Sequence, residues 1–331
     1  CRCCKADQDG TWRLITKAIK SHTGTSLEGA GVISPAKNSR RKQEKRILLW
    51  MALPAFAVYA SLYLYPALSN LLYATQKWDG ITKPEFTGLH NMTYLLTQDD
   101  LFRKALGNNL RFMLVVVIFQ TAFALLFATF LLKNSKTNIF LRIVFFFPTI
   151  LSSVSVGIIW TFLYDPNYGS ITAFLKAIGM GAHAPLWLGN EKITLYSIAL
   201  TQVWFHTGQM IVIYVAGLQQ IPKELYEAAD VDGASRWQQF KGITWPMALP
   251  TTAVVVAYTT IQTFRAFDLI FAMTGGGPSY ASEILVTQIY NTAFISQKFG
   301  YASAQSIVLV VLVLFITWLQ RKTLRVNDGT K

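Results

Sequence analysis

Polar side chains recur at helical spacing inside three long apolar segments of the chain. Three pairs of polar residues lie three or four positions apart, so each pair shares one face of a helix. These pairs are Thr149 and Ser153, His206 and Gln209, and Thr259 and Thr263, with Gln262 beside the last. Because hydroxyl and amide groups are costly against lipid, such residues face the interior of a helix bundle or a water-filled path. They can bind the hydroxyl groups of a polar solute, or they can merely bond one helix to another.

The sequence contains no motif for catalysis or for nucleotide binding. It lacks the phosphate loop G-x-x-x-x-G-K-[ST] and the metal-binding H-E-x-x-H. The glycine run 275–277 has no following Lys and predicts the end of a helix. Cys1, Cys3 and Cys4 lack the paired spacing of a zinc site, and a lone His206 is not a metal site. We therefore expect no catalytic residue, no metal site and no cofactor in this chain.

The composition indicates a membrane protein. Hydrophobic residues make up 52% of the 331 residues and charged residues only 14%, whereas an ordinary soluble domain carries roughly 25% charged residues. The apolar residues come in runs of about 20, the length that crosses a bilayer. Six spans are expected, each helical along its length, at residues 47–75, 109–132, 143–164, 193–218, 250–273 and 301–320. The sequence therefore predicts an all-α polytopic membrane protein.

Basic residues are distributed unevenly between the two sides of these spans. Counted from residue 40 onward, the side that holds the loop 219–245 carries fifteen Lys and Arg residues, and the other side carries seven. Because cytoplasmic loops are enriched in basic residues, both termini are expected in the cytoplasm. The chain has a net charge of +13. Because its basic residues lie at the ends of the spans, we expect them to contact anionic lipid rather than nucleic acid. Residues 1–46 are expected to form a mostly disordered basic extension, 47–322 the transmembrane domain and 323–331 a tail.

The cytoplasmic loop 219–245 is too long for a turn and too polar for lipid. Pro222 can begin a helix, apolar and acidic residues then follow at helical spacing, and Gly233 breaks the pattern. Trp237 and Phe240 continue the apolar spacing after the break. The loop therefore predicts two short amphipathic helices that meet at a glycine and contact a soluble partner. A surface helix that rests on lipid headgroups is the alternative.

The same loop contains three short motifs in order, Glu227-Ala228-Ala229, Asp232-Gly233-Ala234 and Ile243-Thr244-Trp245-Pro246. They resemble the E-A-A loop in the membrane subunits of binding-protein-dependent ABC importers, although Trp245 stands where that family usually has Leu. Later motifs are similar to the carbohydrate-uptake branch of the family, which includes the maltose-type and glycerol-phosphate-type permeases. These motifs are Phe267-Asp268-Leu269-Ile270, Thr274-Gly275-Gly276-Gly277-Pro278 and Phe299-Gly300-Tyr301-Ala302. The resemblance extends over about residues 47–322.

This resemblance implies a six-helix permease of the type I ABC importer fold in the inner membrane of a bacterium. Its E-A-A loop would be the coupling helix that docks on a cytoplasmic ATPase dimer, and that dimer would bind ATP and Mg. The coupling residues implied are Glu227, Ala228, Ala229, Asp232 and Gly233. The other implied partners are an extracytoplasmic solute-binding protein and a second permease subunit, which by family habit is a different chain.

Alignment outward from the E-A-A loop also implies a substrate path for a sugar, an oligosaccharide or a related solute. The residues expected to line it are Thr149, Ser153, Phe205, His206, Gln209, Thr259, Gln262 and Thr263. An aromatic ring can stack on a sugar ring, while amides and hydroxyls bond its hydroxyl groups. Arg265 and Asp268 lie three apart in the fifth span. We expect them to neutralise each other, to face a partner subunit or to contact a charged solute.

Two other classes of membrane protein remain as alternatives. A membrane-embedded enzyme is disfavoured because the sequence has neither paired metal-binding histidines nor a nucleophile elbow. A passive channel is disfavoured because it does not need an acidic cytoplasmic loop. Stimulation of a cognate ATPase subunit by the purified chain would distinguish a transporter from both.

The basic-residue count generates a prediction about topology. In a background whose native cysteines are replaced by serine, Ser170→Cys should react with a membrane-impermeant thiol reagent in intact cells. Ser235→Cys should react only after the cells are opened, because the loop 219–245 is expected on the cytoplasmic side. Labelling in the reverse order would invert the orientation.

Overall fold

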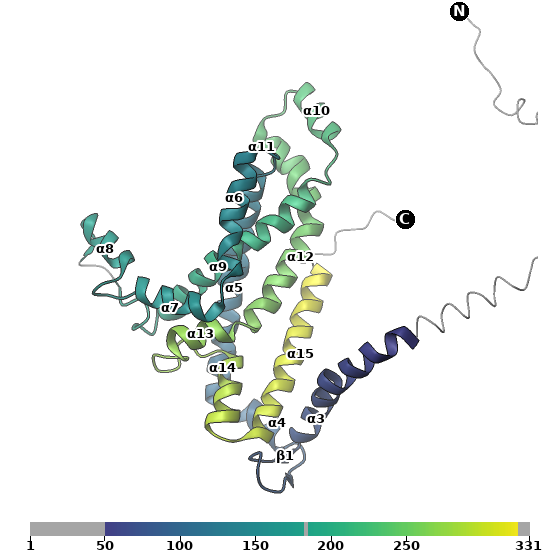
Figure 1. The fold of residues 1–331 in the computed structure, drawn as a ribbon, viewed down its shortest axis with the longest axis vertical. Coiled ribbons are helices and arrows are strands. Elements are labelled where there is room, and N and C mark those ends of the chain that lie inside the picture. Colours follow the sequence, from purple (N-terminus) through teal and green to yellow (C-terminus); the bar gives the residue numbers. More distant parts are fainter. Residues whose placement is uncertain (1–49, 182–184, 324–331) are drawn as a thin grey trace, which may run out of the picture. The chain divides into compact units, whose positions relative to one another are not determined.

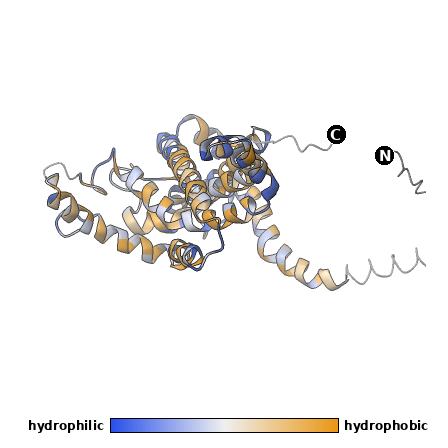
Figure 2. Ribbon diagram, turned by 90° about the horizontal axis from the view of Figure 1, so that it is seen from above, coloured by the Kyte–Doolittle hydropathy of each residue, from blue (hydrophilic) through white to orange (hydrophobic). Residues whose placement is uncertain are grey.

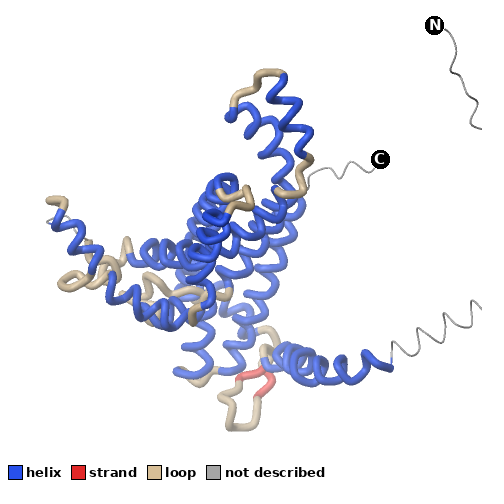
Figure 3. The backbone as a smooth tube through the Cα atoms, turned by 45° about the horizontal axis from the view of Figure 1, so that its top comes forward, coloured by secondary structure: helices blue, strands red, loops and turns tan. Residues whose placement is uncertain are grey.

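The computed structural model describes residues 50–181 and 185–323 (Figure 1). The predicted extension 1–46 lies outside the described residues, as does the predicted tail from residue 324 onward. The chain divides into two units, 1–64 and 65–331. The predicted all-α class is confirmed, because the described strands are limited to the antiparallel pair β1 (Gln76–Lys77) and β2 (Glu85–Phe86), shown in red in Figure 3.

Four described helices are long and apolar enough to cross a membrane. They are Trp50–Tyr73, α5 (Asp100–Phe130), α9 (Thr194–Leu218) and α15 (Phe299–Thr323). The first contains a π-helical turn, η1 (Ala60–Leu64), and ends as α3 (Tyr65–Tyr73), which packs against α15. Two further helix pairs pass the same test but are bent, so the described residues contain up to six spans, in agreement with the sequence prediction.

The third predicted span is not one continuous helix, contrary to expectation. It consists of α6 (Lys136–Phe146), the short 3₁₀ helix η2 (Phe147–Ile150) and α7 (Ser153–Leu163), with a bend of 98°. Pro148 lies in the 3₁₀ turn, where its ring and its missing N–H oppose continuation of an α-helix. Leu151 then adopts extended backbone angles, and α7 begins in a new direction.

The fifth predicted span is also interrupted. A continuous helical run passes through α11 (Arg236–Gln239), the π-helical turn η4 (Phe240–Thr244) and α12 (Trp245–Phe264). It then meets α13 (Phe267–Thr274) at an angle of 46°. Ala266 leaves the helical conformation between them, with ψ of 47°. The predicted stop at the glycine run is confirmed, because Gly275 ends α13 with a φ of +59°, a conformation that favours glycine.

The remaining elements are short helices outside the long ones. They are α4 (His90–Thr97), α8 (Ser170–Ala177), α10 (Lys223–Val231), α14 (Leu285–Tyr290) and the π-helical turn η5 (Asn291–Ile295). Figure 1 shows α10 and α11 at one end of α9 and α12, and α4 and β1 toward the other end. The loop 219–245 and the hairpin therefore lie at opposite ends of the long helices.

Helices α5 and α9 pack side by side and form the centre of the larger unit. Helix α5 begins where the Asp99 side chain accepts a hydrogen bond from the Phe102 N–H at 2.8 Å. At 1.5 Å per residue, its 31 residues extend about 46 Å, which exceeds the ~30 Å of hydrocarbon in a bilayer. Figure 2 shows hydrophobic residues along the helices, with hydrophilic residues interspersed among them.

Threonine side chains of α12 form hydrogen bonds with neighbouring helices. The Tyr214 hydroxyl of α9 donates to Thr252 Oγ1 at 3.1 Å, and the Gln320 amide of α15 donates to Thr260 Oγ1 at 2.7 Å. Such bonds satisfy buried polar groups in a bundle whose surroundings are apolar. They hold α12 in a defined position between α9 and α15.

The close approach of α6 to α9 generates a prediction. A Cβ on Gly208 would be placed onto the Phe145 carbonyl oxygen, so Gly208→Ala should force the helices apart and lower stability by about 1–3 kcal/mol. Gly107→Ala in α5 is the matched control, because its Cβ would meet no atom within 4 Å in the described chain, and the change should raise stability by up to about 1 kcal/mol. Thermal unfolding of the two purified variants in detergent tests this difference, and equal melting temperatures would contradict it.

Candidate functional site

The loop between α9 and α12 contains the two short helices that its sequence predicts. Helix α10 begins at Lys223, directly after Pro222, and ends at Val231. Gly233 follows with a φ of +73°, a left-handed conformation that glycine adopts without strain. Helix α11 differs from the prediction in one respect, since it continues through η4 into α12 instead of ending in the loop.

Hydrogen bonds hold this loop in a fixed shape. The Gln239 amide is buried and donates to Asp230 Oδ1 at 2.5 Å, which joins α11 to α10. The Tyr226 hydroxyl lies 3.0 Å from Thr244 Oγ1 and joins α10 to η4. Ser235 begins α11 with a capping box, which satisfies the free backbone groups at its start. The loop is therefore a folded projection whose outer face is preformed.

The outer face of the projection combines acidic and apolar side chains. Glu227 and Asp232 are exposed, and within the described chain neither carboxylate has an ion pair or a hydrogen bond. Beside them, Val231 is 87% exposed and Trp237 is 70% exposed. Unpaired acids next to exposed apolar residues suit a partner surface that is basic and partly apolar.

The base of the projection is tied to the turn between α5 and α6. Arg142 of α6 donates to the Leu131 carbonyl at the end of α5, with its Nε at 2.9 Å, and to Asn134 Oδ1 at 3.2 Å. Gln219, directly after α9, donates to the same Asn134 oxygen at 3.3 Å. The ends of α5 and α9 and the middle of α6 therefore meet in one hydrogen-bonded network at the base of the projection.

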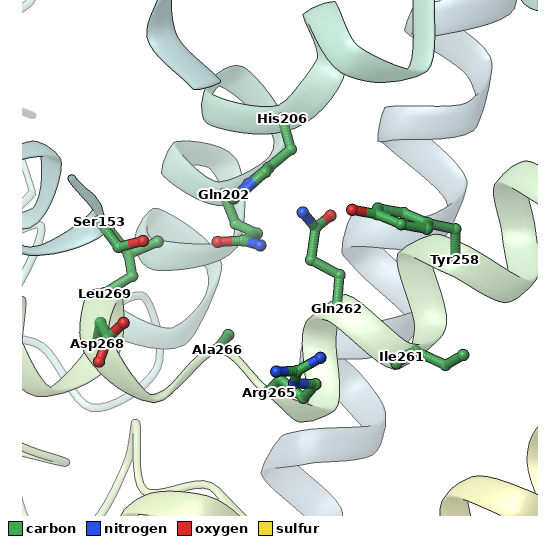
Figure 4. Close-up of a pocket in the computed structure, with 10 residues that line it drawn as sticks. All are labelled: Ser153, Gln202, His206, Tyr258, Ile261, Gln262, Arg265, Ala266, Asp268 and Leu269. Carbon is green, nitrogen blue, oxygen red and sulfur yellow. The ribbon is translucent and has the colours of Figure 1, made fainter. Parts of the chain in front are cut away.

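A polar cavity of about 430 Å³ lies between α7, α9, α12 and α13 (Figure 4). Its lining residues are Ser153, Gln202, His206, Tyr258, Ile261, Gln262, Arg265, Ala266, Asp268 and Leu269. Both helix breaks reach this cavity. Ser153 is the first residue of α7, after the 98° bend, and Arg265 and Ala266 separate α12 from α13.

The polar groups of the cavity are available for bonding. Figure 4 shows Gln202 and Gln262 facing each other across the cavity, with His206 beside Gln202 and Tyr258 beside Gln262. Within the described chain, His206 Nδ1 and Gln262 Oε1 are buried and have no hydrogen-bond partner. Buried polar atoms without partners are costly, so these groups are suited to bind a polar molecule or water. Gln209 reaches the same region, where its amide donates to the Tyr258 hydroxyl at 3.0 Å.

The structure brings together only part of the predicted substrate path. Ser153, His206 and Gln262 line the cavity, and Gln209 contacts its rim through Tyr258. Thr149 does not line it. This residue lies in η2, where its hydroxyl donates to the Phe146 carbonyl.

Three further predicted path residues, Phe205, Thr259 and Thr263, are buried and do not line this cavity, so their place on a substrate path stays a prediction. Phe205 packs in the apolar core between α5, α7 and α9, because successive residues of a helix point about 100° apart and its neighbour His206 takes the cavity face. Thr259 accepts from Gln120 of α5 at 3.5 Å, and Thr263 donates to the Thr260 carbonyl at 2.7 Å. Thr259 therefore bonds α12 to α5, the alternative considered from the sequence, whereas Thr263 bonds only within its own helix.

Arg265 and Asp268 do not neutralise each other. Arg265 lies in the break directly after α12 and Asp268 lies in α13, and in the described residues no salt bridge joins them. Both are exposed and both line the cavity, so each charge is free to meet a partner. The sequence predicted them on one continuous helix and could not place them around a break.

Two polar cavity residues were missed by the sequence prediction. Gln202 lies four residues before His206 on α9, and Tyr258 lies four residues before Gln262 on α12. That spacing places Gln202 on the same helix face as His206, and Tyr258 on the same face as Gln262. Extending the helical spacing by one turn from His206 and from Gln262 would therefore have predicted both residues.

Comparison with known proteins agrees with this architecture. Residues 120–323 match the family described as binding-protein-dependent transport system inner membrane component. The probable ABC transporter permease protein YurN of Bacillus subtilis is 32% identical over 283 residues, which cover 85% of this chain and 96% of that protein. The multiple sugar-binding transport system permease protein MsmF of Streptococcus mutans is 32% identical over 261 residues, covering 78% of this chain and 89% of that protein.

Solved structures share the fold. A chain in the crystal structure of a bacterial alginate ABC transporter, in complex with its alginate pentasaccharide-bound periplasmic protein, matches with a TM-score of 0.74 at 22% identity. The match covers 86% of this chain and 96% of that chain. With the family match and the two sequence relatives, these findings show that the chain belongs to the inner-membrane components of binding-protein-dependent transport systems, the permease subunits of ABC transporters.

Proposed function

We propose that this chain forms half of the translocation path of an ATP-driven importer for a sugar, an oligosaccharide or a related solute. The observation that carries the proposal is the polar cavity at the meeting point of two helix breaks. Helix breaks at membrane depth are tolerated where they line a cavity, and binding sites of transporters form there. The relative from Streptococcus mutans, a multiple sugar-binding permease, supports the solute class.

The cavity offers the groups that a hydroxylated solute requires. Amide, imidazole and phenol groups provide both donors and acceptors, and Ser153 adds a hydroxyl. Phe205 is buried, so the aromatic ring that can stack on a sugar is Tyr258, which lines the cavity. Arg265 and Asp268 add one charge of each sign at the break, where a charged substituent of the solute would meet a partner.

The α10–α11 projection would couple this cavity to ATP hydrolysis. We propose that its acidic face, with Glu227, Ala228, Ala229 and Asp232, docks on a separate ATPase dimer that binds ATP and Mg. From Arg236 to Phe264 the helical run is about 43 Å long, at 1.5 Å per residue, and it ends directly at the break beside Arg265. A rigid-body movement of the projection would therefore reach the cavity through one continuous helix.

The remaining partners follow from this arrangement. The projection would lie in the cytoplasm together with both termini, in keeping with the excess of basic residues on that side. A solute-binding protein would deliver solute at the opposite end, and a second permease subunit would complete the path. The crystal structure of the alginate transporter with its periplasmic protein provides the precedent for such delivery.

The cavity generates a prediction about transport. Gln262→Leu should lower solute uptake about tenfold, because loss of a hydrogen bond in a desolvated site costs about 1–2 kcal/mol, while basal ATPase activity of the assembled transporter persists. Thr263→Val is the matched control, since this buried hydroxyl bonds only the Thr260 carbonyl in the described chain, and it should keep uptake within about twofold. The measurement is uptake of a panel of radiolabelled mono- and oligosaccharides, normalised to the assembled transporter.

Equal uptake by the two variants would contradict the assignment of the cavity as the path. The same conclusion would follow if Thr263→Val were the more damaging change.

The projection generates a prediction about coupling. Glu227→Lys should abolish co-purification of the ATPase or uncouple hydrolysis from uptake, because it replaces attraction to a basic partner with repulsion. Glu85→Lys in β2 is the matched charge reversal at the other end of the molecule, where the residue is exposed, and it should leave ATPase association unchanged. Wild-type association of the Glu227→Lys variant, with wild-type solute-stimulated hydrolysis, would refute a coupling role.

Gly233 tests the shape of the same surface. A Cβ at this position would meet no atom within 4 Å in the described chain, so the effect of Gly233→Val should come from the backbone, which valine disfavours at positive φ. Gly233→Asn should be tolerated, since asparagine adopts this conformation more readily. ATPase association of the two variants should therefore differ, although the substituted side chains are similar in size.

A further inference from the structure

A second cavity lies at the end of α5 and α9 that is opposite the α10–α11 projection. Its volume is about 340 Å³, and it is lined by Lys104, Asn108, Arg111, Glu191, Lys192, Leu195, Tyr196 and Ala281. Three of these side chains are cationic and one is anionic, so the cavity carries a net positive charge. It shares no lining residue with the polar cavity described above.

The positive charges of this second cavity exceed the single negative charge of Glu191, and none of the three cations is in an ion pair within the described residues. In the described part of the chain, Lys104, Arg111 and Lys192 have no carboxylate oxygen within 4.0 Å. Lys104 is fixed by a different bond, in which its Nζ donates to the Ser279 carbonyl at 2.6 Å. Three cations around one space repel each other, so an anion bound between them would be stabilised.

The cations lie at the level where an apolar span begins. Residues 112–130, directly after Arg111 on α5, contain no charged side chain, and neither does α9 from Thr194 to Leu218. Lys192 precedes α9 by two residues, and Tyr196 lies in its first turn. Basic side chains and tyrosine at the end of an apolar span are typical of the headgroup region of a bilayer.

Exposed apolar residues continue from the cavity toward the middle of the span. On α5, Lys104, Arg111 and Ile118 recur every seven residues and so share one helix face, and Ile118 is exposed. On the adjacent α9, Leu200 is exposed four residues after Tyr196. Two neighbouring helices therefore present a basic cavity with an apolar surface beneath it. An acidic loop of a protein partner would need no such apolar continuation.

We propose that this cavity binds the phosphate headgroup of an anionic phospholipid, whose acyl chains lie along the exposed faces of α5 and α9. The phosphodiester would contact Lys104, Arg111 and Lys192, while Tyr196 would mark the boundary between headgroup and chains. The proposal is independent of the transported solute, and it concerns the leaflet opposite the projection.

Native mass spectrometry of the purified full chain tests the proposal, with phosphatidylglycerol and phosphatidylcholine of the same acyl chains as probes. Wild-type protein should retain phosphatidylglycerol in preference to phosphatidylcholine. The triple variant K104Q/R111Q/K192Q should lose that preference, since each cation near an anionic headgroup contributes about fivefold in affinity. The conservative variant K104R/R111K/K192R should retain it.

A second triple variant, K77Q/K176Q/K298Q, is the matched control. It removes the same charge from exposed lysines that do not line the cavity, and it should bind phosphatidylglycerol as the wild type does. If both glutamine variants lose the preference for phosphatidylglycerol equally, the preference depends only on the net charge of the protein, and the proposal is overturned.

Two other outcomes would also overturn it. If inorganic phosphate displaces phosphatidylglycerol at equal concentration, the site recognises a free anion and the acyl chains contribute nothing. If K104Q/R111Q/K192Q keeps its lipid preference but loses solute uptake in cells, the cavity serves an acidic protein partner or the solute instead of a lipid.

Discussion

The structure depends on the requirement that backbone N–H and C=O groups in a bilayer be bonded within the protein or face a polar cavity. This chain interrupts a membrane helix at two places, after η2 and after α12, and both interruptions reach the same cavity. Local bonds satisfy part of the freed backbone, such as the Phe267 N–H to the Arg265 carbonyl at 2.8 Å. The same two breaks that would be unfavourable against lipid create the polar centre of the molecule.

Helix α12 connects the two candidate sites. Its helical run starts in the α10–α11 projection and ends at the cavity, and three of its threonines bond to three different helices, α5, α9 and α15. These bonds explain why a polar residue within an apolar segment need not face a solute. Because these attachments hold α12 to three neighbouring helices, the helix is suited to move with them as a packed body rather than to bend alone.

The projection is rigid for a related reason. Its internal polar groups are paired with each other, as in Asp230 with Gln239 and Tyr226 with Thr244, whereas Glu227 and Asp232 are left without a partner in the described chain. A surface of this kind keeps its shape while its free charges remain available for another protein. The free acids at this end and the excess of cations in the second cavity at the opposite end give the molecule two charged surfaces of different sign.

The sequence by itself determined the helical class, the approximate spans, the glycine break in the projection and the family. Each of these follows from local patterns: apolar length, helical spacing, the need for positive φ at Gly233, and contiguous motifs. Sequence also indicated that His206 and Gln262 face a polar interior. The same reasoning could not show that Phe205, Thr259 and Thr263 lie outside this cavity, because the face that a helix turns toward a cavity is decided by its neighbours and not by its own periodicity.

Only the tertiary structure decided where the helices break and what meets at the breaks. Nothing in the apolar pattern of residues 250–273 distinguishes a straight helix from one bent by 46°, since both bury similar residues. The separation of Arg265 from Asp268, and the convergence of α7, α9, α12 and α13 on one cavity, arise from packing between segments far apart in the sequence. Periodicity within one helix carries no information about such contacts, and the shape of the site depends on them.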